Sequence, residues 1–231
     1  MLQPRTYPEL LGKALMLDAD PHVVLQDDDQ PWVEGLVITV LVGALAGLAQ
    51  LIGGWLLNLT MPPAALTLSA LLDSIGATLG PAVQAESEPA VRLLWGWVGL
   101  ITGYGGGWGR LLIVAGMPLL LVVQWAFFGF IGYGVASYLG GKGSLSQTLG
   151  AVGLMVAPQV LLFFRIIPFV SVSGLLLAVW SLLIAYRAIE VVHELPWRKA
   201  VISTLTLPVI LGLAGLAAYL VNAAILYVGG M

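Results

Sequence analysis

The sequence predicts an all-α membrane protein, a bundle of five transmembrane helices. Its 231 residues are 59% hydrophobic and 9% charged, whereas soluble domains are about 25% charged. Residues 145–186 carry a single formal charge, Arg165. A straight helix of that length would be roughly 63 Å long, about twice the thickness of the hydrocarbon core, so the chain must turn back near Arg165 and Pro168. Three other apolar runs, 35–57, 111–139 and 200–227, are each long enough to cross once.

Residues 1–33 form a cytoplasmic or interfacial N-terminal segment ahead of the membrane domain, 34–231. No signal-peptide pattern occurs in it. Five apolar residues can share one helix face: Leu10, Leu11, Ala14, Leu15 and Leu17. That face predicts either a short helix lying in the membrane interface or a helix that caps the bundle by ordinary packing.

The first span, 35–57, contains the small residues Gly43 and Gly47 four positions apart. Such a pair lets two membrane helices approach closely. We expect packing inside the bundle first and dimerisation second.

Residues 60–109 are predicted to form an interfacial or re-entrant insertion. Pro62 and Pro63 end the first span, and Glu86 and Glu88 fall in a polar linker. The apolar stretch 91–104 would be roughly 21 Å long as a helix, which is too short to cross.

The remaining spans are separated by short turns. The second, 111–139, ends at a turn containing Gly140 and Gly141. The third, 145–164, contains Pro158, and Pro168 opens the fourth, 169–191; the fifth is 200–227.

The basic residues predict the orientation. Five spans place six of them on the side of the N-terminus and three on the other: Arg5, Lys13, Lys142, Arg187, Arg198 and Lys199 against Arg92, Arg110 and Arg165. The N-terminus is therefore expected in the cytoplasm and the C-terminus on the opposite side. If 91–104 also crossed, the split would be four against five and would give no orientation.

No pattern of catalytic, metal-binding or cofactor-binding residues is found. The chain has no cysteine, and its net charge of −3 comes without the basic clusters that nucleic-acid binding needs. The glycines around Lys142 lack P-loop spacing, because Ala136 and Gly143 stand where Gly and Ser or Thr are required. His22 and His193 lie outside the predicted spans and are expected at the surface. We expect no enzyme activity, cofactor or metal.

Polar residues suggest two sets of structural contacts. Arg187, Glu190, His193 and Glu194 form a predicted interfacial charge cluster at the end of the fourth span, where Arg187 can pair with Glu190 at i,i+3. Inside the spans lie four neutral amides, which either make interhelical hydrogen bonds or line one polar cavity: Gln50, Gln124, Gln159 and Asn222.

Several diffuse motifs occur in a familiar order. They are ALMLD at 14–18, YLGGKGS at 138–144, QTLG at 147–150, Gly153, Ala157–Pro158, Ile167–Pro168, Trp180 and WRKA at 197–200. With these motifs the chain resembles bacterial members of the YIP family (Ypt-interacting proteins), most firmly over 111–220 and more loosely over 8–58. The resemblance implies five helices with a cytoplasmic N-terminus.

Eukaryotic relatives of that family bind Rab-type GTPases and one another in Golgi traffic. This chain has DDQPW at 28–32 in place of their aspartate-leucine-tyrosine-glycine-proline motif, and it lacks their long cytosolic arm. We therefore do not expect GTPase binding. The sequence instead favours a membrane adaptor, organiser or accessory subunit that contacts lipid and other membrane proteins, or a second copy of itself, through helix packing. The alternative is a small transporter or channel component whose four amides line a cavity.

Overall fold

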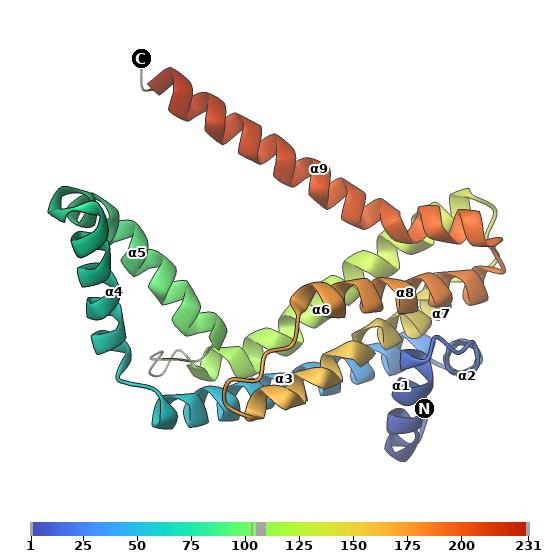
Figure 1. Cartoon of the computed structure of the whole chain (residues 1–231). Coiled ribbons are helices and arrows are strands. Elements are labelled where there is room, and N and C mark those ends of the chain that lie inside the picture. The colour runs from blue at the N-terminus through green and yellow to red at the C-terminus, as the bar shows by residue number, and fades with distance from the viewer. Residues whose placement is uncertain (1, 103, 105–109, 230–231) are drawn as a thin grey trace. The chain divides into compact units, whose positions relative to one another are not determined.

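The computed structural model describes residues 2–102, 104 and 110–229, and every regular element in those residues is helical (Figure 1). The elements are η1 (Pro4–Thr6), α1 (Tyr7–Leu15), α2 (Asp20–Gln26), α3 (Pro31–Thr60), α4 (Ala64–Leu79), α5 (Pro81–Thr102), α6 (Arg110–Tyr138), α7 (Leu145–Val152), η3 (Gly153–Ile166), α8 (Gly174–His193) and α9 (Trp197–Gly229). Five stretches are long and apolar enough to cross a membrane: Pro31–Thr60, Val114–Tyr138, Leu145–Ile166, Gly174–His193 and Trp197–Val221. The predicted five-span fold is confirmed.

The chain divides into two compact units, and the division falls within four of its long helices. The first unit comprises residues 1–39, 122–158 and 178–231, and the second comprises 40–121 and 159–177. We call them the polar unit and the open unit, after the features described below.

In the polar unit, the start of α3 crosses α7 at backbone distance. A Cβ atom added to Gly150 would lie 2.7 Å from the Cβ and carbonyl oxygen of Pro31, and one on Gly153 would lie 2.5 Å from the Cα of Gly35. Only glycine leaves room for such a crossing. It was not predicted, because the sequence analysis considered only Gly43 and Gly47.

The N-terminal helices pack onto the same unit. Leu10 and Ala14 of α1 are buried, α2 packs against α7, and the indole nitrogen of Trp180 on α8 donates to the carbonyl of Leu15 at 3.0 Å. These contacts favour the capping interpretation of the N-terminal helix. Its contact with the membrane interface stays a prediction.

In the open unit, α3 and α6 approach closely at Gly43, where an added Cβ would lie 2.5 Å from the Cα of Pro118. Gly47 is also buried. Gly43 therefore serves packing inside the chain, as was expected first. Beside these helices, Ala46, Leu162 and Leu177 form a small buried apolar cluster.

The insertion between the first two spans is a helical hairpin (Figure 1). Thr60 ends α3, Gly80 turns the chain with φ of 95°, and α5 begins at Pro81 rather than near residue 91. The predicted polar linker at Glu86 and Glu88 is thus wrong. Proline suits the first turn of a helix, and Glu88 pairs with Arg92 at i,i+4, which supports helix through the polar residues.

The third span changes its winding halfway, and the fourth starts later than predicted. α7 gives way to the 3-10 helix η3, which contains Pro158. The chain then turns at Ile167–Phe169, and α8 begins at Gly174 instead of Phe169. Phe169 has φ of 67°, a left-handed conformation that cannot begin an α-helix. The predicted bend at Arg165 and Pro168 is confirmed, but Pro168 does not open the next helix.

Candidate functional site

A glycine turn joins α6 to α7 and packs against the end of α8. Gly140 has φ of 91°, and the N–H of Gly141 donates to the carbonyl of Ala136 at 2.8 Å, as in a Schellman cap. A Cβ on Gly141 would lie 2.6 Å from Nδ1 of His193. The turn predicted at Gly140 and Gly141 therefore has a structural role, since it lets α6 and α8 meet.

His193 is buried and holds this junction, which corrects its predicted surface position. Its side chain lies 2.9 Å from the hydroxyl of Thr148, measured from Nε2. That hydroxyl donates its own hydrogen to the carbonyl of Ser144 at 2.8 Å. It must therefore accept from Nε2–H, because one hydroxyl has one hydrogen to donate.

The predicted charge cluster is divided among separate contacts. Arg187 and Glu190 form the expected ion pair, and Glu190 also accepts from the hydroxyl of Tyr186 at 2.9 Å. Glu194 instead pairs with Lys142 at 2.6 Å. Arg187 and Glu190 thus pair within α8, whereas His193 contacts α7 and Glu194 contacts the turn after α6, so the four residues do not form one charged surface.

His22 is also buried, contrary to the surface position that was predicted. Its Nδ1 lies 3.3 Å from the carbonyl of Ala151, which can only accept, so Nδ1 carries a hydrogen. Burial lowers the pKa of His22 to about 4 against the raising effect of this hydrogen bond, and the charge of Arg187 adds a smaller lowering effect. His22 is therefore neutral at pH 7.

A buried carboxylate anchors the N-terminus on α3. Glu34 is 1% exposed. Its two oxygens accept from the hydroxyl of Tyr7 at 2.8 Å and from the backbone N–H of Leu2 at 2.9 Å. Burial, followed by the hydrogen bond to Glu34, raises the pKa of Tyr7 to about 12. Tyr7 therefore remains a hydrogen-bond donor throughout the physiological pH range.

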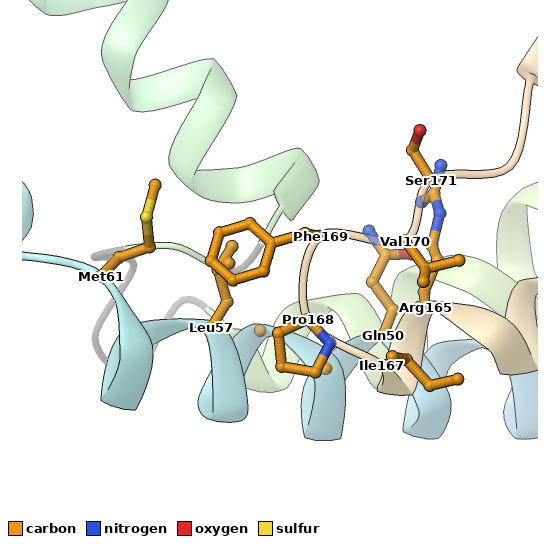
Figure 2. A pocket seen from close by; sticks show the side chains of 11 residues that line it. Gln50, Leu57, Met61, Arg165, Ile167, Pro168, Phe169, Val170 and Ser171 are labelled. Atoms are coloured by element: carbon orange, nitrogen blue, oxygen red, sulfur yellow. The ribbon is translucent and has the colours of Figure 1, made fainter.

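The open unit contains a cavity of about 340 Å³ where α3 and η3 end. Gly53 and Gly54 form part of its wall, together with Leu57, Pro168 and Phe169. Figure 2 shows the side chains of Gln50 and Arg165 extending in the same direction, towards the segment that carries Val170 and Ser171. The cavity thus combines an apolar lining with one amide and one guanidinium.

The sequence matches the model of a known protein family. The model of the Yip1 domain matches residues 21–219 of the chain. The chain belongs to the Yip1 domain family. No curated protein and no solved structure shows significant similarity to it.

The residues matched by the Yip1 domain model span the α4–α5 hairpin, which was predicted from the sequence as an interfacial or re-entrant insertion. It also includes the glycine turn, the prolines of the third span and the bend, and the glycine crossing of α3 with α7. The polar contacts that Leu2 and Tyr7 make with Glu34, and that Leu15 makes with Trp180, each have one partner outside the matched residues.

The four intramembrane amides of this Yip1 domain are not seen to share one site. Gln50 lines the cavity. Gln124 and Gln159 are half-buried and do not line it, and Asn222 lies outside the residues whose side chains the structure describes. A common polar cavity formed by all four stays a prediction.

Sequence reasoning missed Glu34, His22 and Thr148. The available signal for Glu34 was a lone carboxylate next to the first apolar run, since a charge that close to the membrane needs a partner. His22 and Thr148 gave no such signal, because their burial depends on residues 129 and 45 positions away.

Proposed function

We propose that this Yip1 domain protein is a membrane adaptor, organiser or accessory subunit that binds other membrane proteins through helix contacts and carries out no catalysis. Family membership and five candidate spans support a multi-pass membrane protein. In this proposal it resides in a bacterial cytoplasmic membrane with its N-terminus in the cytoplasm. The basic residues support that orientation, since five spans put six of them, Lys142 and Lys199 included, on the side of the N-terminus and three on the other.

The apolar surface of the α4–α5 hairpin carries the proposal. Leu93 and Leu94 are 64% and 61% exposed, and Trp97 and Leu66 are exposed as well. Neither helix of the hairpin is among the candidate spans. Large exposed apolar side chains clustered within a few residues of one helix, as at Leu93, Leu94 and Trp97, are typical of an interaction site.

Contacts of Tyr104 with both helices of the hairpin hold the hairpin in one arrangement. Such a preformed surface is suited to docking. At its base the hydroxyl of Tyr104 contacts the hydroxyl of Thr67 at 2.8 Å and donates to the carbonyl of Pro62. The ring of Tyr104 packs edge-on against Trp95, with centroids 6.0 Å apart. A preformed surface loses little conformational entropy on binding. The occupant we propose is an apolar helix of another membrane protein.

The test is affinity purification from native membranes in particles that retain the native lipids. The wild type is expected to bring down a stoichiometric membrane partner. The double variant Leu93→Ala/Leu94→Ala should recover about tenfold less of it, because apolar interface anchors contribute roughly 1.4 kcal/mol or more.

The matched control is Leu119→Ala/Leu120→Ala on α6, where the two leucines are 65% and 61% exposed. It loses the same apolar area from a predicted span and should recover the partner unchanged. A protein that elutes alone, as a monomer of unaltered stability, would contradict the proposal.

The transporter alternative requires the four amides to converge, and only Gln50 is known to line the cavity. The geometry of the open unit therefore favours the adaptor.

A further inference from the structure

Among the described residues that line the cavity of the open unit, Arg165 is the only one with a formal charge, and that charge is positive. Gln50 and Ser171 supply an amide and a hydroxyl; the other described lining residues are apolar or glycine. Among the described residues no carboxylate forms an ion pair with Arg165. The described lining residues therefore offer donors for an anion and include no acidic group that could bind a cation.

A guanidinium in apolar surroundings favours a bound anion. Arginine presents a planar set of N–H donors that matches the oxygens of a phosphate. The C-terminal ends of α3 and η3 contribute only partial negative charges. The full charge of Arg165 therefore sets the sign of the site.

The position of the cavity points to a lipid as the source of that anion. Arg165 is next to last in η3, and Leu57 and Met61 lie at the end of α3. In the five-span topology this is the end of a membrane crossing, where long basic side chains reach the headgroups. Ile167 and Phe169 at the rim are 53% and 72% exposed, so apolar surface continues outward from the cavity.

The backbone at the rim is held in an unusual conformation. Phe169 has a φ of 67°, which is uncommon for a bulky residue and marks a constrained position. Because of this turn Pro168, Phe169 and Val170 all line the same cavity (Figure 2). These three rim residues are therefore part of the site.

We propose that this cavity binds one anionic phospholipid, with the phosphate on Arg165 and part of an acyl chain along the apolar lining and rim. A volume of about 340 Å³ is within the range of small-molecule sites and suits a head group with the first carbons of one chain. This site goes beyond the adaptor function and does not depend on it, since partner capture by the hairpin uses different residues.

Native mass spectrometry of the full chain tests the proposal. The delipidated protein is given equal amounts of phosphatidylglycerol and phosphatidylcholine with identical acyl chains. Wild type should retain one phosphatidylglycerol with roughly tenfold preference, because both lipids have the phosphate but the choline cation of phosphatidylcholine would lie near the guanidinium of Arg165 and cancel the net negative charge of the head group. Arg165→Gln should remove the preference. Arg92→Gln, which removes an exposed arginine of the same unit, should keep it.

Three results would overturn the proposal. One is equal retention of the two lipids by wild type, a comparison that needs no variant to fold. Another is an undiminished preference in Arg165→Gln. The third is displacement of the lipid by inorganic phosphate or glycerol phosphate at similar concentration, which would identify a site for small soluble anions.

Discussion

The two units differ in how many buried polar side chains they contain. Of the nine buried polar or charged residues that the structure describes, eight lie in the polar unit and only Gln50 lies in the open unit. In the polar unit several of them join elements that are far apart in sequence, as Glu34 does with Tyr7 and His193 does with Thr148. The open unit has an apolar cavity and a hairpin with exposed leucines.

This difference suggests that the two units of the membrane domain have different roles. Buried hydrogen bonds inside a membrane protein fix one arrangement, because an unpaired polar group there is costly. The polar unit is therefore the part of the fold in which hydrogen bonds determine how the helices are arranged. Apolar surface adapts to lipids or other helices more easily, and the open unit offers the surfaces on which both of our binding proposals rest.

The largest effect is expected at the glycine crossing of the polar unit. Gly150→Leu should lower the free energy of unfolding by about 3 kcal/mol, because its side chain would overlap Pro31. Thermal unfolding in mild detergent measures the change. Gly134→Leu and Gly116→Leu, where an added Cβ meets nothing within 4 Å, are the controls in the polar and open units. Equal destabilisation by all three substitutions would contradict the claim that the close backbone contact at Gly150 causes the loss of stability.

Acid should weaken the polar unit through His22. Its pKa is about 4 when folded and about 6.5 when unfolded, so the unfolded chain takes up the proton first. The stability that neutral His22 provides is complete above pH 6.5 and is lost as the pH falls towards 4, by about 2 kcal/mol at pH 5. Unfolding curves at pH 7 and pH 5 should show this loss. His22→Gln should abolish the His22 part of it, and an unchanged pH dependence would show that His22 does not titrate as described.

Removing one buried donor should have a smaller effect. Tyr7→Phe leaves an oxygen of Glu34 without its partner and should lower the free energy of unfolding by about 1.5 kcal/mol. Chemical denaturation measures it, and limited proteolysis should show earlier cleavage near the N-terminus. Stability equal to that of wild type would mean that the N-terminal segment is not held by Glu34.

The smallest effect is expected for an exposed ion pair of the open unit. Arg92 and Glu88 lie 2.7 Å apart with side chains 56% and 41% exposed. Arg92→Gln should change the free energy of unfolding by less than about 0.5 kcal/mol. A loss as large as that of Tyr7→Phe would contradict the contrast between the two units.

Sequence predicted the parts of the fold that local composition controls. Apolar runs marked the five spans, and Gly140, Pro62 and Pro168 marked turns. It missed the features that depend on distant partners. Gln50 and Arg165 line one cavity because Gly53 lets α3 approach the backbone of Arg165, and His22 is buried because α2 packs on α7. The extension of α5 through Glu86 and Glu88 was missed because charged residues were taken to interrupt the helix.

The proposed five-span topology would place the cavity and the hairpin on one side of the membrane, and this can be tested directly because the chain has no cysteine. Single variants Lys142→Cys, Ser171→Cys and Glu88→Cys are treated with a membrane-impermeant thiol reagent in intact cells and in inverted vesicles. We predict labelling of positions 88 and 171 in cells only, and of position 142 in inverted vesicles only. Labelling of 88 and 171 from opposite sides would contradict the five-span account.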